Sequence, residues 1–176
     1  AIHSFSVNAG RTLHQVLKSN FRGHTERKEP LKRLFTTYQR RKRELDVLDY
    51  DDLLTRWCEL LEHDEVGPRI AARFDYVLVD EYQDTNPLQA RLLKLLRPDG
   101  RRLTVVGDDA QSIYSFRAAT VRNILDFPGQ FPDTRVIKLE QNYRSTEPLL
   151  AASNQVIAAA REQYKKKLWS ERRQGS

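Results

Sequence analysis

The chain has 176 residues, of which 39% are apolar, and this is enough for one domain with a modest core, with or without a small appendage. No apolar run reaches about 18 residues and no signal-peptide pattern opens the sequence, so neither a membrane span nor secretion is supported. The single cysteine, Cys58, excludes an internal disulfide, and we expect a cytoplasmic protein.

The net charge of +6 is divided unevenly along the chain. Residues 11–43 carry eleven Lys and Arg against two Glu, whereas residues 44–96 carry five basic against thirteen acidic residues. This division fits a chain in which one part meets a polyanion and another part holds a divalent cation. On charge alone, a solvated helix face explains the basic run equally well.

Residues 1–47 are predicted to be a helical, polar appendage. The segment LKRLFTTYQRRKREL, residues 31–45, follows a break at Pro30, has apolar residues at helical spacing and turns residues 40–43 largely toward solvent. Asp49 and Asp52 then mark the N-terminus of a helix that runs to about residue 63, where VGPRI ends it. In that helix leucines 53, 54, 60 and 61 share a face with Trp57, and the neighbouring Cys58 is expected to pack rather than react.

Three apolar strands are predicted next, at FDYVLV (74–79), LTVV (103–106) and VIKL (136–139), and the first reads as a strand covered on both faces. Asn86 and Pro87 begin a helix that PDG (98–100) ends. AATVRNILDF (118–127) is predicted as another helix with FPGQFPD as its turn, and a last helix starts near Ser145 or Thr146. Only the tail from residue 165 looks loose.

A polar cluster follows each predicted strand: DEYQDTN from residue 80, GDDAQSIYSFR from residue 107 and QNYRS from residue 141. Asp80, Gln111 and Arg144 lie 31 and 33 residues apart, about one strand-helix-strand unit each. In an open parallel sheet, ligands bind beyond the carboxyl ends of the strands, so the clusters should converge on one crevice. We therefore expect a nucleotide site there.

The three clusters resemble motifs II, III and IV of the UvrD/Rep family of superfamily 1 DNA helicases. IHSF (2–5) is similar to the Ser-containing DNA-contact motif, LDYDDLL (48–54) to the helix entering the core, and KKLW (166–169) to the start of the second motor domain. The resemblance implies an α/β fold, namely a partial RecA-like P-loop NTPase domain with a parallel sheet and flanking helices, plus a small helical N-terminal appendage. Its expected divisions are a shortened, basic inserted subdomain (1–65), a core fragment (66–145), and a C-terminal helix and tail (146–176).

The resemblance also implies ATP and Mg²⁺ as cofactors. Asp80 would hold Mg²⁺, and Glu81 would orient or deprotonate the attacking water. Gln111 would touch the γ-phosphate, Arg144 would act as an arginine finger, and Tyr143 would pack against the adenine. DNA contacts are implied for five residues, with a core role left open for the tyrosine: His3, Ser4, Tyr114, Phe116 and Arg117.

The sequence departs from the family at two positions and lacks one motif. The family usually has Asp where Ala110 stands, and Gly where Ala118 stands. None of the seven glycines belongs to GxxxxGK[ST], the Walker A loop that grips the β- and γ-phosphates and that the family places before IHSF. We expect an internal fragment of a helicase, or a remnant of one, that does not run a catalytic cycle alone and does not bind ATP or Mg²⁺ tightly.

The leading hypothesis is that the parent protein is an ATP-dependent DNA translocase and helicase acting on single-stranded DNA and duplex junctions, with 3′-to-5′ polarity implied by resemblance only. One alternative is a degenerate module that binds nucleic acid or a protein partner through residues 11–43. Another is the motor part of a helicase-nuclease, which Ala110 disfavours because nuclease-linked relatives often carry Lys there. Roles in repair, replication restart and plasmid maintenance remain open.

Overall fold

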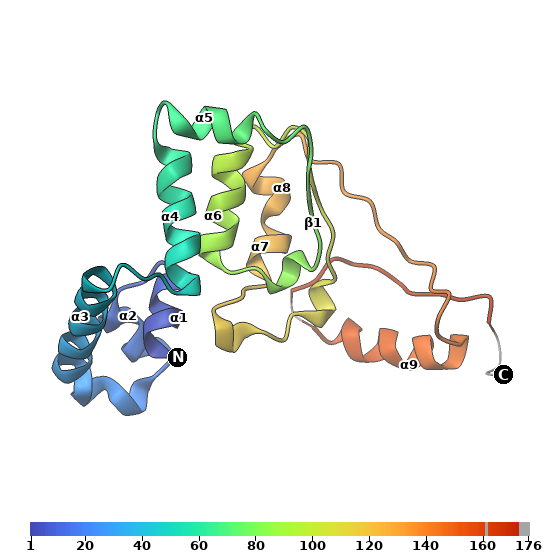
Figure 1. Cartoon of the computed structure of the whole chain (residues 1–176). Coiled ribbons are helices and arrows are strands. Elements are labelled where there is room, and N and C mark those ends of the chain that lie inside the picture. The colour runs from blue at the N-terminus through green and yellow to red at the C-terminus, as the bar shows by residue number, and fades with distance from the viewer. Residues whose placement is uncertain (161, 173–176) are drawn as a thin grey trace.

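A two-stranded parallel sheet lies at the centre of the chain, formed by β1 (Val77–Val79) and β2 (Leu103–Val105). The computed structural model describes residues 1–160 and 162–172. Figure 1 shows three parts around this sheet, namely a group of N-terminal helices, a core in which helices cover the sheet, and a C-terminal arm that extends away from the core.

The N-terminal helices are α1 (Ile2–Asn8), α2 (Leu13–Ser19) and α3 (Lys28–Glu44), and the 3₁₀ turn Arg22–Arg27 precedes α3. Thr12 caps α2 and receives a reciprocal contact from Gln15. The predicted break at Pro30 is absent, because Pro30 lies in the first turn of α3, where a missing N–H is tolerated.

The core helices are α4 (Tyr50–Glu62), α5 (Val66–Ala71) and α6 (Pro87–Leu96). VGPRI therefore forms a short helix of its own, and Asn86 caps α6 as predicted. Cys58 is 1% exposed and packs in an apolar cluster, which confirms its packing role. The predicted shared face of α4 is wrong, because Leu61 faces α6 together with Cys58 while three apolar side chains remain exposed: Leu53, Trp57 and Leu60.

The sheet is covered on one face only within the described residues. Val77 pairs with Leu103, and Val79 pairs with Val105. These four side chains pack on a buried cluster of Tyr82, Leu93, Ile124, Phe127 and Phe131. On the opposite face Leu78 is 76% exposed, so the expected two-sided cover of the first strand is not present.

The helix predicted over residues 118–127 is shorter and broken. Its two pieces are α7 (Arg122–Leu125) and α8 (Phe127–Gln130). Ala118 has φ of 65°, which a right-handed helix cannot accommodate, and Pro128 has no N–H to donate to Ile124. The Ile124 carbonyl instead accepts a hydrogen bond from the Tyr164 hydroxyl, at 3.0 Å.

The third predicted strand is not part of the sheet. Residues 136–139 pair with neither β1 nor β2, and Ile137 and Leu139 are exposed. The segment leads to α9 (Glu147–Ala158), which begins directly after Thr146, close to the predicted start. Trp169 of the returning tail forms a β-bridge with Gln141, so the start of the tail is held rather than loose, and residues 173–176 lie outside the described range.

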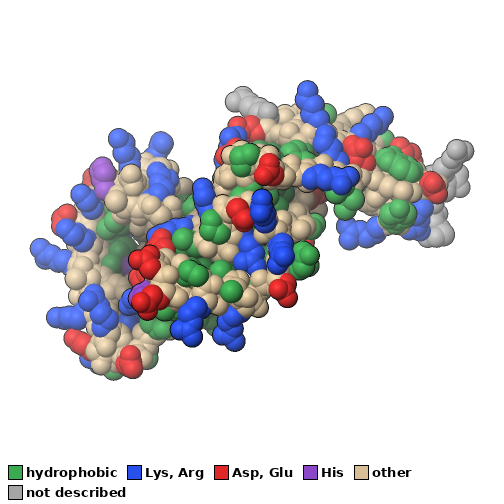
Figure 2. Space-filling view, turned by 90° about the horizontal axis from the view of Figure 1, so that it is seen from above, with side chains coloured by type: hydrophobic (Ala, Val, Ile, Leu, Met, Phe, Trp, Pro, Cys, Tyr) green, Lys and Arg blue, Asp and Glu red, His purple; other side chains and the backbone are tan. Residues whose placement is uncertain are grey.

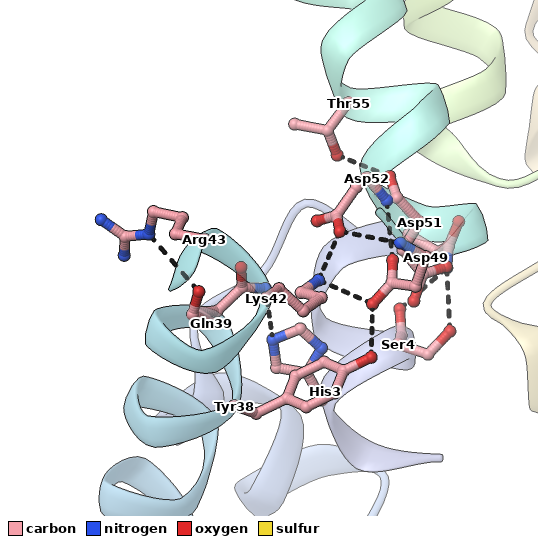
Figure 3. Close-up of polar contacts among 11 residues, drawn as sticks. His3, Ser4, Tyr38, Gln39, Lys42, Arg43, Asp49, Asp51, Asp52 and Thr55 are labelled. Carbon is pink, nitrogen blue, oxygen red and sulfur yellow. Dashed lines mark hydrogen bonds and ion pairs between the residues drawn. The ribbon is translucent and has the colours of Figure 1, made fainter. Parts of the chain in front are cut away.

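A buried lysine joins α3 to α4 (Figure 3). Lys42 is 6% exposed, and its Nζ atom lies 2.7 Å from Asp49 Oδ2 and 2.5 Å from Asp52 Oδ2. Asp49 and Asp52 form the predicted cap of α4, since each carboxylate accepts the backbone N–H of the other. Lys42 thus points toward the core, whereas its basic neighbours in residues 40–43 face solvent as predicted.

The electrostatics of this contact favour the ionised forms. Burial by itself raises the pKa of Asp49, but hydrogen bonds from Lys42, the Asp52 N–H and Tyr38 lower that pKa well below its ordinary value. Burial likewise lowers the pKa of Lys42, and its two carboxylate partners more than reverse this. The contact therefore stabilises the fold as long as Asp49 is ionised.

We expect Lys42→Met to lower the free energy of unfolding at pH 7 by about 2 kcal/mol, below the range for a fully buried pair because both acids are partly exposed. Because the folded-state pKa of Asp49 is depressed, its contribution is present above pH of about 4 and is lost as the pH falls through the folded value. Urea unfolding should show the difference between wild type and variant narrowing below that pH. The exposed Lys32→Met is the control, and an equal loss in both variants contradicts the assignment.

Candidate nucleotide site

The loops after β1 and β2 leave the sheet at the same edge. Because the strands are parallel, their carboxyl ends lie side by side, and backbone hydrogen bonds extend this pairing beyond the strands: Val106 N–H donates to the Val79 carbonyl at 2.8 Å, and Tyr82 N–H to the Val106 carbonyl at 2.9 Å. The convergence predicted from the sequence is therefore present for the first two polar clusters.

Asp80 and Glu81 are exposed directly after β1. Glu81 takes a left-handed conformation with φ of 51° and ψ of 40°, at a cost of about 1–2 kcal/mol for a residue with a side chain. Its N–H donates to Asp80 Oδ1 at 2.9 Å. The sharp turn keeps both carboxylates at the carboxyl end of β1.

Gln83 joins the two loops and was missed by sequence reasoning. Its side chain is among the most buried in the chain, at 1% exposure. Nε2 donates to Glu81 Oε2 at 2.7 Å, while Oε1 accepts the N–H of Asp108 at 3.0 Å. A Cβ atom at Gly107 would lie 2.6 Å from Gln83 Oε1, so a glycine after β2 is the one sequence signal of this bridge.

Gln111 lies in the second loop and is held by an acidic neighbour. Its Nε2 donates to Asp108 Oδ2 at 2.8 Å, within the 3₁₀ turn Asp109–Gln111. Asp108 also contacts Lys166 from the C-terminal segment. Sequence reasoning did not assign Lys166 a role, because nothing in its spacing places it beside a loop almost sixty residues earlier.

Tyr143 and Arg144 are not brought to this edge. Both are exposed and lie just before α9, on the arm that extends away from β1 (Figure 1). The Tyr143 hydroxyl donates to Gln141, and the backbone carbonyls of both residues accept from Arg172. Three of the four expected catalytic residues, Asp80, Glu81 and Gln111, lie at this edge of the sheet. Arg144 lies away from it, because the predicted strand before Arg144 does not join the sheet.

His3 and Ser4 are engaged within the N-terminal helices. The His3 ring makes edge contacts with Phe35 and Tyr38, with ring centroids 4.9 Å and 5.7 Å apart, and its Nε2 lies 3.3 Å from Gln39 Nε2 (Figure 3). The Ser4 hydroxyl accepts a hydrogen bond from Asn8 at 3.2 Å. Both residues are half-buried, so α1 presents little of either side chain to a ligand.

Tyr114, Phe116 and Arg117 form one exposed cluster. The two rings lie 5.8 Å apart, and the Arg117 guanidinium lies 5.3 Å and 5.5 Å from their centroids. Phe116 is 66% exposed and Tyr114 is 36% exposed, so neither is a core residue. An exposed aromatic pair with an arginine is suited to stacking on nucleic-acid bases.

The two departures from the family pattern have different consequences. Ala110 is exposed, and Asp108 supplies the side-chain hydrogen bonds of its turn, so the turn forms without an acid at position 110. Ala118 has φ of 65°, the region that favours glycine. Its methyl group is buried with Phe5 and Val16, which offsets part of the backbone strain.

Asp80 fits the requirements of Mg²⁺. Magnesium in nucleotide sites is held by one or two carboxylates and the substrate phosphates, with water completing the octahedron. Asp80 is exposed at the carboxyl end of β1 and offers such a carboxylate. In the described part of the chain, no group of three His, Cys, Asp or Glu side chains is placed to hold a metal ion by itself.

Among the same described residues, no helix is long and apolar enough to cross a membrane.

Comparison with known proteins identifies the family. The sequence profile of the UvrD/REP helicase N-terminal domain matches residues 3–132. The chain is 44% identical over 171 residues to ATP-dependent DNA helicase UvrD1 of Mycobacterium tuberculosis, which covers 90% of the chain and 22% of the relative. It is 40% identical over 148 residues to the helicase PcrA of Leuconostoc citreum, covering 84% of the chain and 20% of the relative.

A third relative, PcrA of Staphylococcus aureus, is 44% identical over 138 residues, covering 78% of the chain and 19% of the relative. The chain thus spans about a fifth of the length of the curated relatives that it matches. The profile match covers well over half of the chain, and on this evidence the chain belongs to the UvrD/Rep helicase family.

Proposed function

We propose that this chain forms part of the ATP-hydrolysing motor of a DNA helicase that moves along single-stranded DNA from 3′ to 5′. The observation that carries the proposal is the meeting of the β1 and β2 loops, which places Asp80, Glu81 and Gln111 at one edge of the sheet. The named activity of the relatives, ATP-dependent DNA helicase, supports the same conclusion.

The proposed chemistry divides among the side chains of this edge. Asp80 would hold Mg²⁺ through its exposed carboxylate, and bound Mg²⁺ neutralises charge on the phosphates. Glu81, fixed by Gln83, would orient the attacking water and accept its proton. Gln111 would contact the γ-phosphate. Arg144 and Tyr143 can serve as arginine finger and adenine contact only if residues 141–145 are brought to this edge.

We propose further that the chain acts within a longer polypeptide and does not hydrolyse ATP alone. The 176-residue sequence contains no Walker A loop to bind the β- and γ-phosphates. One face of the sheet exposes Leu78, although parallel sheets are normally covered on both faces. The much greater length of the relatives supports this interpretation.

In the full-length protein, we expect Glu81→Gln to lower the kcat of ATP hydrolysis stimulated by single-stranded DNA on the order of 10²-fold or more, because general-base catalysis contributes about 10²–10⁴-fold. The KM for ATP should change little, since the substituted side chain is isosteric. Steady-state hydrolysis with and without an oligonucleotide measures both. Glu65→Gln, an exposed acid outside the site, is the control, and full hydrolysis by the Glu81 variant refutes the role.

A second candidate function is nucleic-acid binding through residues 11–43. Of the eleven basic residues there, Lys42 is buried and Lys28 is half-buried, whereas nine are exposed. Figure 2 shows Lys and Arg side chains projecting from much of the surface that the N-terminal helices form. This surface can attract a polyanion with or without an ATP cycle.

For this candidate we expect the 176-residue chain to bind a single-stranded oligonucleotide with an affinity that falls as salt is added, so that log Kd rises linearly with log salt concentration. Replacing Arg33 and Arg40 by Ala should reduce the slope by about 0.7 for each phosphate that the variant no longer neutralises. Fluorescence anisotropy over a salt series measures this slope. Lys94→Ala, exposed on α6, should leave it unchanged, and binding that is insensitive to salt rules the surface out.

A further inference from the structure

The C-terminal segment of residues 163–168 forms hydrogen bonds and ion pairs with the loop that follows β2. Tyr164 N–H donates to Asp109 Oδ2 at 3.0 Å, and the Tyr164 hydroxyl donates to the Ile124 carbonyl at 3.0 Å. Lys166 Nζ lies 2.5 Å from Asp108 Oδ1 and 2.9 Å from Asp109 Oδ1. Lys166 therefore contacts both acids of this loop, and Tyr164 contacts one of them, Asp109.

The contact is shielded from solvent. The Lys166 side chain is 13% exposed, and those of Asp108 and Asp109 are 32% and 3% exposed. Burial lowers the pKa of Lys166, but its hydrogen bonds to both carboxylates raise that pKa above the ordinary value. The ammonium group thus stays charged at neutral pH and separates two adjacent carboxylates that would otherwise repel each other.

Asp108 transmits this contact to Gln111. Its Oδ2 atom accepts the Gln111 amide at 2.8 Å, while its Oδ1 atom accepts the Ala110 N–H at 3.1 Å in addition to Lys166. An ionised carboxylate only accepts hydrogen bonds, so the NH₂ group of Gln111 must face Asp108. The carbonyl oxygen of Gln111 is then turned away from Asp108, and it accepts no hydrogen bond from the part of the chain that the structure describes.

We propose that Lys166 is a positioning residue for ATP hydrolysis, which fixes the orientation of the Gln111 amide by holding Asp108. This inference rests on the function proposed above. Without the ammonium group, Asp108 and Asp109 would move apart, and Gln111 would lose the acceptor that fixes its rotamer. The segment that leads away from the core would thereby control the geometry of the glutamine nearest the expected γ-phosphate.

The kinetic test uses full-length protein and a double-mutant cycle. Lys166→Met should lower DNA-stimulated kcat on the order of tenfold, because a misplacement of about 1 Å can cost up to 10²-fold. Lys166→Arg should recover most of the rate. In a Gln111→Ala background, Lys166→Met should cause no further loss. Lys165→Met is the matched control, since the Lys165 side chain is exposed and has no polar contact within the described residues.

A purely structural role for Lys166 predicts a further loss of kcat in the Gln111→Ala background, and that result overturns the proposal. An unchanged kcat in Lys166→Met also overturns it. If wild-type protein hydrolyses no ATP, the proposed function fails while the positioning contact can still be tested.

Nuclear magnetic resonance of the ¹⁵N-labelled 176-residue chain provides that independent measurement. The side-chain amide resonance of Gln111, assigned as the one that disappears in Gln111→Ala, should shift and exchange faster with solvent in Lys166→Met. It should not change in Lys165→Met. A Gln111 resonance that is the same in wild type and Lys166→Met contradicts the contact, whether or not the protein hydrolyses ATP.

Discussion

The hydrogen bonds of Gln83 are the constraint on which the candidate site depends. A buried amide must satisfy both of its ends, and here one end binds the Glu81 carboxylate while the other accepts the backbone N–H of Asp108. Gly107 leaves the room that this side chain requires. Two loops that are separate in sequence are thereby fixed relative to each other, and the left-handed turn at Glu81 is stabilised by its surroundings.

Two lysines, the buried Lys42 and the half-buried Lys166, attach the peripheral segments to this core in a similar manner. Lys42 joins α3 to the two acids at the start of α4, and Lys166 joins the C-terminal segment to the two acids after β2. In each case one cation separates two carboxylates that also accept backbone N–H hydrogen bonds. Such contacts specify a geometry more strongly than they add stability, because desolvation offsets much of the attraction.

The sequence predicted correctly those features of the fold that depend on residues close to one another along the chain. The caps at Asp49 and Asn86 fall where predicted, because cap residues act on the next few residues. The last helix also starts beside Thr146 as predicted, and the first two strands pair in parallel. Contacts between distant segments could not be predicted. The sequence gives no sign that Lys42 is buried, that Lys166 reaches Asp108, or that residues 136–139 remain outside the sheet.

The uncovered apolar strands have a consequence for handling the isolated chain. Leu78 on the open face of β1, together with Ile137 and Leu139 in an extended segment outside the sheet, gives the surface two unprotected strand-like elements. Exposed apolar surface of this kind favours association with other molecules. Concentrated preparations of the 176-residue chain should therefore self-associate, and solubility will improve when these apolar side chains are covered by additional polypeptide.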